Sequence, residues 1–132
     1  MSTQHTPGPW AFSTSTNGWC YTINIFQADN ATPTDGWSDV GYIVKTCEGE
    51  QQAIQHANAC LIAAAPELLE ACQTFAEWLR REDDGFDHKT HNRQTPEGEA
   101  AWREWFYGNI ALCGLAQEQV RAAIAKATGG AV

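Results

Sequence analysis

Basic residues are scarce in this sequence of 132 residues, which has eight Lys and Arg against sixteen Asp and Glu and a net charge of −8. Proteins that bind duplex DNA or RNA need a basic surface to engage the phosphates. Anionic membranes likewise attract basic rather than acidic surfaces. The composition therefore argues against both classes of partner, and it leaves room for one small anionic ligand in a local pocket.

The sequence also lacks a long hydrophobic run and any closely spaced pair of cysteines. No apolar segment follows Met1, and the longest stretch of small apolar residues, 59–65, is too short to cross a bilayer. The five cysteines are odd in number, which is typical of free thiols in a reducing compartment rather than of a disulfide framework or a zinc finger. We therefore expect a cytoplasmic protein with no membrane contact.

Recognisable catalytic motifs are missing as well. The sequence contains no glycine-rich phosphate loop, no nucleophile elbow and no His-Glu-x-x-His segment. No serine or cysteine stands in a motif that supplies it with a base. We therefore expect a protein that is not an enzyme, with no catalytic residues and no cofactor.

The first third of the chain has the alternation that is typical of β-strands. Trp10 and Phe12 lie on one face of a predicted first strand, and Asn17-Gly18 predicts a tight hairpin because a type I′ turn requires positive φ at both positions. A second strand is predicted over 19–28 and a third over 39–47, with a polar loop between them. These segments predict an antiparallel meander of about three strands.

From Glu50 onward the apolar residues repeat at helical spacing. Pro66 interrupts the repeat and predicts the first turn of a second helix, which runs to about Arg81. After a polar loop over 82–96, a last helix is predicted over 97–128, and two glycines end it. The apolar stripe of the first helix contains Ile54, Ala57, Asn58, Leu61, Ile62 and Ala65, and that of the last contains Trp102, Trp105, Phe106, Asn109, Cys113, Ala116, Val120, Ala123, Ile124 and Ala127.

Together these segments predict an α+β fold in a single domain over 1–132. Three strands cannot bury their own apolar face, so two or three helices are expected to pack on one side of the sheet. The last helix, about 45 Å long at about 1.5 Å per residue, would overreach a monomer of this size. We therefore expect a homo-oligomer in which Trp105 or Tyr107 is buried between chains.

The loop before the last helix is the best candidate for a metal site. It contains Asp83, Asp84, Asp87, His88 and His91, and a His-x-x-His pair with carboxylates nearby is a reasonable ligand set for zinc. The segment fits neither an EF-hand nor a helical zinc motif. We therefore expect a polar loop between helices, with no bound metal.

Asn58 and Asn109 are the most informative polar residues because each falls on the apolar stripe of a helix. A buried amide must find hydrogen-bond partners, so each side chain either pins the fold or faces a ligand. The surplus of tryptophan suits stacking on flat rings, and two arginines beside the last stripe suit a phosphate. The candidate ligand-binding residues are Trp10, Asn58, Arg103, Asn109 and Arg121.

Two stretches resemble small proteins encoded by tailed bacteriophages and prophages. They are His-Thr-Pro-Gly-Pro-Trp at 5–10 and Asn-Ala-Cys-Leu-Ile-Ala-Ala-Ala-Pro-Glu-Leu-Leu-Glu-Ala at 58–71. Proteins of this kind usually have arginine where Cys60 stands here. The resemblance implies a phage-encoded accessory protein that works in the cytoplasm of the host cell during infection.

A short meander followed by helices is also similar to the architecture of the phage anti-Thoeris sponge proteins. This resemblance implies an oligomer that binds a nucleotide-type immune signal, such as a cyclic ADP-ribose-like molecule or a cyclic oligonucleotide, between its chains without turnover. The favoured hypothesis is therefore an anti-defence sponge. The alternative is a protein–protein interaction module that inhibits a host or defence protein through an acidic and aromatic surface.

Overall fold

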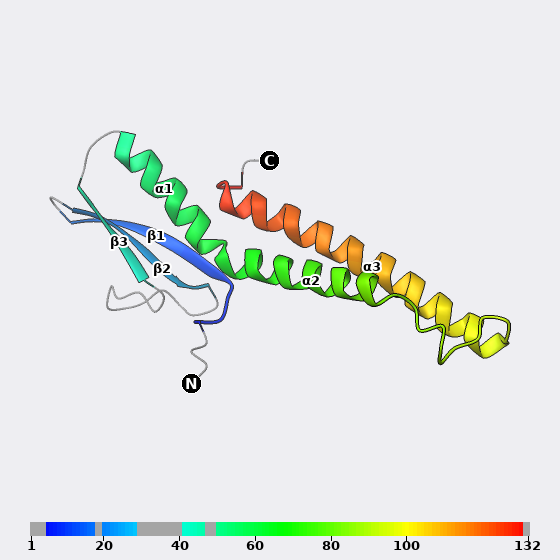
Figure 1. Cartoon of the computed structure of the whole chain (residues 1–132). Helices are drawn as coiled ribbons and strands as arrows, with labels where there is room; N and C mark the ends of the chain where they lie inside the picture. The colour runs from blue at the N-terminus through cyan, green and yellow to red at the C-terminus, as the bar shows by residue number, and fades with distance from the viewer. Residues whose placement is uncertain (1–4, 18–19, 29–40, 47–49, 131–132) are drawn as a thin grey trace. The chain divides into compact units, whose positions relative to one another are not determined.

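The computed structural model describes residues 5–17, 20–28, 41–46 and 50–130 (Figure 1). Antiparallel strands come first, and three helices follow, of which the last is the longest. The α+β class and the long last helix are therefore confirmed. The elements are β1 (Trp10–Asn17), β2 (Cys20–Gln27), β3 (Gly41–Thr46), α1 (Glu50–Ala63), α2 (Ala65–Asp84) and α3 (Pro96–Ala127).

The chain forms two compact units, which we describe separately. The sheet unit contains the residues up to Leu69 together with those from Arg121 onward. The hairpin unit runs from Glu70 to Val120 and contains most of α2 and α3.

In the sheet unit the strands are ordered β1-β2-β3, and both neighbouring pairs are antiparallel. Asn17 lies opposite Cys20, whereas a turn centred on Asn17-Gly18 would place Thr16 opposite Trp19. The connection is thus shifted by one residue from the prediction, and Gly18 and Trp19 themselves lie outside the described residues. The register places Phe12 opposite Ile25 and gives the sheet one apolar face, on which Ile23 and Ile25 are buried.

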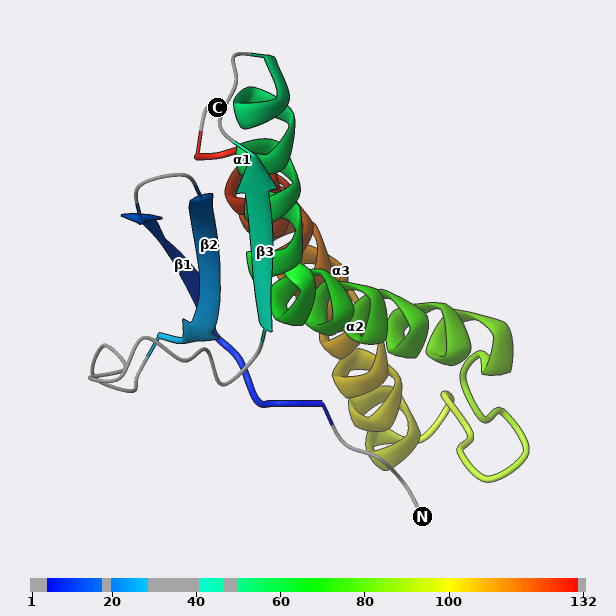
Figure 2. The same ribbon diagram turned by 90° about the vertical axis from the view of Figure 1, so that its left-hand side faces the viewer.

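Helix α1 covers this face and contacts all three strands (Figure 2). Its buried residues are small, namely Ala59, Cys60 and Ala63, and His56 makes an edge contact with Phe12 at 5.2 Å between ring centroids. Small side chains let the helix backbone approach the two isoleucines closely.

The apolar stripe predicted for α1 is therefore wrong. Ile54 and Leu61 are 61% and 54% exposed, and Asn58 is exposed beside them. Helix α1 carries apolar residues on two sides, and helical spacing alone does not say which side meets the sheet.

Within the sheet unit, α1 lies against all three strands. Helices α2 and α3 are linked to each other by two side-chain hydrogen bonds. The packing of two or three helices on one face of the sheet stays a prediction.

The break between α1 and α2 falls beside Pro66, as predicted. The first segment of the chain packs here, because a side chain at Gly8 would overlap the Pro66 ring. Lys126, near the end of α3, donates to Glu67 Oε1 at 2.5 Å. Gly129 and Gly130 then end the helix with φ of 83° and 74°, a left-handed backbone that favours glycine.

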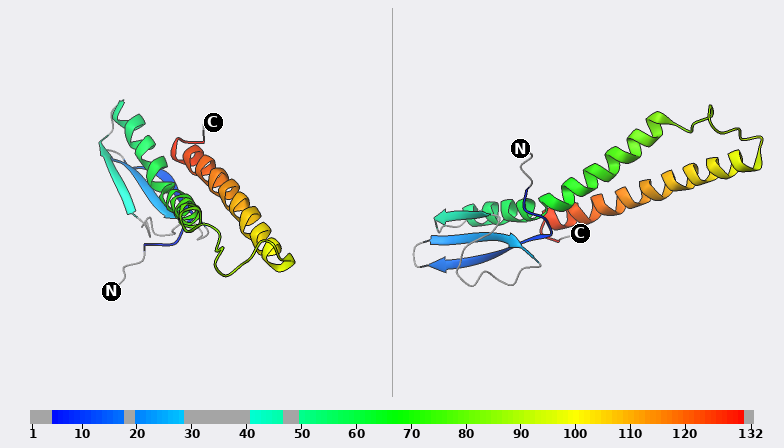
Figure 3. Two further views of the ribbon diagram at one scale, coloured as in Figure 1. Left: turned by 45° about the vertical axis from the view of Figure 1, so that its right-hand side comes forward. Right: turned by 90° about the horizontal axis from the view of Figure 1, so that it is seen from below.

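In the hairpin unit, α2 and α3 run antiparallel (Figure 3). The buried and half-buried residues named below recur every three or four positions along each helix, and we call them the seam. Two polar contacts span the pair: Asn109 Nδ2 donates to Glu82 Oε1 at 2.7 Å, and Gln119 Nε2 donates to Glu70 Oε1 at 3.2 Å. The seam consists of Ala71, Thr74, Trp78 and Arg81 of α2 with Asn109, Leu112, Ala116 and Gln119 of α3, all of them buried or half-buried.

Candidate functional site

The loop that joins α2 to α3 is organised around the ring of Phe86. His91 stacks on this ring at 5.8 Å between centroids, and His88 meets its edge at 5.0 Å. Trp105 of α3 lies 6.0 Å away in a tilted arrangement. The two histidines that suggested a metal site therefore pack against an aromatic ring.

Asp87 and Thr95 fix the backbone of the same loop. Asp87 Oδ1 accepts hydrogen bonds from the backbone N–H groups of Lys89 and Thr90, each at 3.1 Å, and hydrogen bonding to Thr90 lowers the pKa of Asp87. Thr95 Oγ1 accepts from the backbone N–H of Gly98 at 3.1 Å, so Thr95 is the N-cap of α3 and Pro96 takes its first turn.

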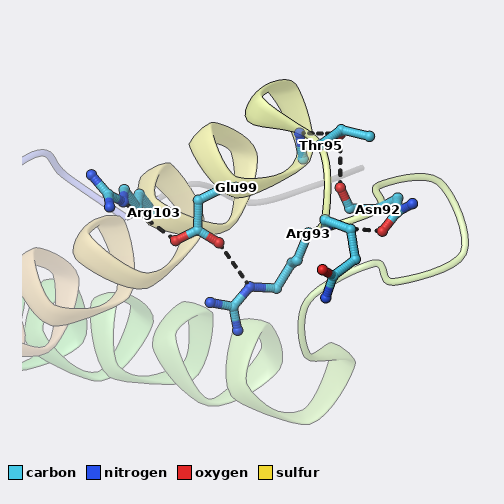
Figure 4. A network of polar contacts seen from close by, with 7 residues as sticks. Asn92, Arg93, Thr95, Glu99 and Arg103 are labelled. Atoms are coloured by element: carbon cyan, nitrogen blue, oxygen red, sulfur yellow. Dashed lines mark hydrogen bonds and ion pairs between the residues drawn. The ribbon is translucent and has the colours of Figure 1, made fainter.

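A chain of charged contacts follows at the start of α3 (Figure 4). Arg93 lies over the Trp102 ring, 3.8 Å from its centroid, and donates from Nε to Glu99 Oε2 at 3.2 Å. Arg103 donates to the other oxygen of Glu99 at 3.4 Å. Hydrogen bonding from Arg93, assisted by Arg103, lowers the pKa of Glu99. The arginines at this end of the hairpin are thus engaged within the chain.

The two sides of the hairpin differ in chemistry. In an antiparallel pair of right-handed helices, the residues one position after each facing residue are turned by about 100° toward the same side of the pair. On this side α2 places Cys72, Phe75 and Leu79, and α3 places Phe106, Ile110, Cys113 and Val120. We call these seven residues the apolar face.

The opposite side of α2 is polar and contains Glu70, Gln73, Glu77, Arg80 and Asp84. Arg80 bridges Glu77 and Asp84, each at 2.7 Å, on this side. On the apolar face, by contrast, between 38% and 53% of Phe75, Leu79, Phe106, Ile110 and Val120 is exposed. The sequence prediction placed Phe106, Cys113 and Val120 on the apolar stripe of the last helix, but it did not predict that this row is exposed. In the sequence, this face is visible as an apolar row in each helix whose members lie one position after the residues of the seam.

The sheet unit holds a small cavity of about 230 Å³. Trp10 forms one wall, and its Nε1 donates to the carbonyl oxygens of Thr6 at 3.1 Å and Pro7 at 3.2 Å, which fixes the plane of the indole. The cation in the lining is Lys126, which is paired with Glu67. The lining residues are Trp10, Ala11, Phe12, Cys60, Ala63 and Lys126.

A sequence-family model described as Salmonella phage P22 protein Y8K6 matches residues 1–131. The chain belongs to this phage protein family. No curated protein and no solved structure matches it. Membership of the Y8K6 family confirms the phage origin that the two sequence stretches implied, whereas the relation to sponge proteins stays a prediction.

The five candidate ligand-binding residues are divided between the two units. Trp10, Asn58 and Arg121 belong to the sheet unit, and of the five it is Trp10 that lines the cavity. Asn58 and Arg121 are exposed. Arg103 and Asn109 belong to the hairpin unit.

Asn109 is buried, with 3% of the residue exposed. Its Nδ2 donates to Glu82, and its Oδ1 has no hydrogen-bond partner. Of the two roles that the sequence left open for this amide, the contact to Glu82 favours a structural one, because it links the two helices of the hairpin.

Within the described ranges, no three His, Cys, Asp or Glu side chains gather in a group suited to a metal ion. No single described helix is long and apolar enough to cross a membrane; the segments Ala53–Ala63 and Ala65–Asp84 satisfy the criteria of length and composition only as a pair, and they are bent by 47°.

Proposed function

We propose that this phage protein acts without catalysis by binding another protein through the apolar face of its hairpin unit. The observation that carries the proposal is the group of large apolar side chains exposed on one side of the hairpin. Five large apolar side chains are at least 38% exposed on one side, while α2 places an acid-rich polar row on the other. Contiguous exposed apolar side chains rimmed by polar ones are typical of protein interaction sites.

The polar groups of the hairpin unit give less support to a small ligand. A small-molecule site is a concave pocket of about 300–1,000 Å³ in which a few polar groups converge on the ligand. Here Arg93 and Arg103 are paired with Glu99, and Asn109 is paired with Glu82. A nucleotide would have to break these contacts before these groups could bind it. The protein-binding alternative is therefore the better supported function.

One observation favours the nucleotide sponge as a second candidate. The cavity of the sheet unit combines a fixed indole ring, Trp10, with an ammonium group, Lys126. A flat ring stacked on Trp10 with a phosphate near Lys126 would suit this pairing. The volume of about 230 Å³ accommodates only part of a cyclic nucleotide, so a sponge would need residues from a second chain to complete the site.

A photocrosslinking amino acid distinguishes the two functions. We would place it at position 79, on the apolar face, and at position 80, the next residue but on the polar side. In extracts of infected host cells, protein binding predicts a covalent protein adduct from position 79 and little or none from position 80. Equal adducts from both positions would contradict the proposal.

The same purified protein, incubated with a panel of cyclic nucleotides and then heated, tests the sponge. Protein binding predicts that no nucleotide is retained. Release of an intact nucleotide, combined with no adduct from position 79, would replace the protein-binding function by the sponge.

A further inference from the structure

We infer that the partner of the apolar face is the same face of a second copy of this chain, so that two hairpins form a four-helix assembly. The inference rests on the proposed function, because it names the protein that this face binds. Three observations support a second copy over an unrelated protein: the number of apolar rows, the area of the face and its lack of charge.

The rows on α2 and α3 fit a four-helix bundle better than an isolated hairpin. A helix that packs on one neighbour needs one apolar row, whereas a helix in a four-helix bundle contacts two neighbours and needs two adjacent rows. In α3 the row at the seam contains Leu112 and Ala116, and the second row contains Ile110 and Cys113. In α2 the row at the seam, which consists of Ala71, Thr74, Trp78 and Arg81, is partly polar, and Cys72, Phe75 and Leu79 form the second, apolar row.

The area of the face matches one side of a standard protein interface. Its five large side chains are 38% to 53% exposed, and with about 200 Å² for each fully exposed side chain they present roughly 430 Å² together. A standard interface buries about 800 Å² per partner, of which about 60%, or roughly 500 Å², is apolar. One such face, if fully covered by another, would therefore supply most of the apolar area of a standard interface.

The lack of charge on the face suits self-pairing in an acidic protein. The chain has a net charge of −8, so two copies repel each other wherever their charged surfaces meet. The seven residues of the face carry no charge. Two polar residues lie on the same side: Gln117 donates to Cys113 Sγ at 3.5 Å, and the carboxylate of Glu82 accepts a hydrogen bond from Asn109. When two copies pair through this face, none of the fourteen side chains in contact is charged, so these side chains do not repel one another.

The mass of the purified full-length protein in solution tests the inference. Light scattering should return twice the chain mass of 14.5 kDa. The double variant Leu79→Lys/Ile110→Lys should return the mass of a single chain, because it places ammonium groups in the contact. The matched control is Leu115→Lys, which replaces an exposed leucine on the other side of α3 and should leave the dimer intact.

Circular dichroism checks that each variant is folded. If the double variant does not fold, the photocrosslinker at position 79 in the purified protein replaces it and should yield a covalent dimer, whereas the same group at position 80 should not.

A single-chain mass at millimolar concentration would overturn the inference, as would a dimer that survives the double variant but not Leu115→Lys. An adduct to a different protein from position 79, with no dimer, would overturn the second copy and leave the proposed function standing. No adduct of any kind would overturn both.

Discussion

At the scale of single residues, Asn109 shows how a buried amide can link two helices. It sits in the seam between α2 and α3, where only 3% of it is exposed, and its one hydrogen bond reaches Glu82 in the other helix. A polar residue at one seam position fixes which residues of two helices lie opposite each other, at some cost in stability. The partnerless Oδ1 represents part of that cost here.

The substitution Asn109→Asp should destabilise the protein in a pH-dependent way. The new carboxylate would be buried close to Glu82, so its pKa in the folded state would be raised above its unfolded value. Because the carboxyl pKa is higher in the folded state than in the unfolded state, the free energy of unfolding falls as the pH rises from the unfolded pKa to the folded pKa. At neutral pH we expect a loss of about 3–5 kcal/mol, the cost of an uncompensated buried charge.

Urea unfolding at pH 7 and at pH 4 measures this effect, and the loss should shrink at the lower pH. Asn109→Leu is the control, since it removes the unpaired oxygen and adds apolar contacts without adding charge. A Leu variant that is as unstable as the Asp variant would show that the amide itself, and not the avoidance of charge, matters at this position.

At the scale of elements, the start of α3 depends on a close approach of backbone to backbone. A Cβ at Gly98 would overlap the backbone carbonyl of Asn92, the residue that helps to order the loop before Thr95. Glycine is required here because the nearby backbone leaves no room for a Cβ atom, and not because the backbone φ is positive. The cap of α3 and the loop before it therefore form one local structure.

Two glycine substitutions in α3 should change stability in opposite directions. Gly98→Ala should cost about 1–3 kcal/mol, because the added methyl group forces the loop away from the helix. Gly114→Ala should raise stability by about 0.5–1 kcal/mol, because nothing lies within 4 Å of its Cβ position and alanine favours the helix. Thermal and urea unfolding measure both, and equal effects at the two sites would contradict the close approach at Gly98.

The two sides of α1 should likewise respond differently to substitution. Asn58 is exposed, so Asn58→Ala should change stability by no more than about 0.5 kcal/mol. Ala63 is buried, so Ala63→Leu should destabilise by about 1–3 kcal/mol through overpacking. Denaturant unfolding compares the two variants. A large loss at Asn58 with none at Ala63 would mean that the opposite side of α1 meets the sheet.

At the scale of the whole molecule, the net negative charge opposes the pairing of two chains, and the uncharged face favours it. Two chains of net charge −8 repel at long range, while the apolar contact acts only at short range. Added salt screens the repulsion and leaves the apolar contact unaffected or stronger. The pairing proposed above should therefore respond to ionic strength in the sense opposite to that of a salt-bridged interface.

Sedimentation equilibrium should show that dimerisation becomes tighter as salt rises from about 0.01 M to about 0.1 M, over which the screening length falls from about 30 Å to about 10 Å. The double variant Leu79→Lys/Ile110→Lys should stay monomeric at both concentrations. Dimers that dissociate as salt rises would point instead to charged contacts between the chains.

The sequence by itself determined the features that depend on neighbouring residues. Alternation and helical spacing predicted an α+β chain, and Pro66 located the break between two helices. The last helix was predicted over 97–128 and spans Pro96–Ala127. Among the candidate site residues, Trp10 lines the cavity of the sheet unit, and its role in ligand binding stays a prediction. These features follow from backbone preferences and capping, which act over a few residues.

Only the tertiary structure decided which apolar rows are covered. Helix α1 has small residues on one side and large ones on the other, and it is the small side that meets Ile23 and Ile25. Asn109 pairs with Glu82, 27 residues earlier in the chain, and no local pattern connects the two. Periodicity shows that a helix has an apolar side, but when two sides are apolar the choice depends on the shape of the surface that comes to lie against it.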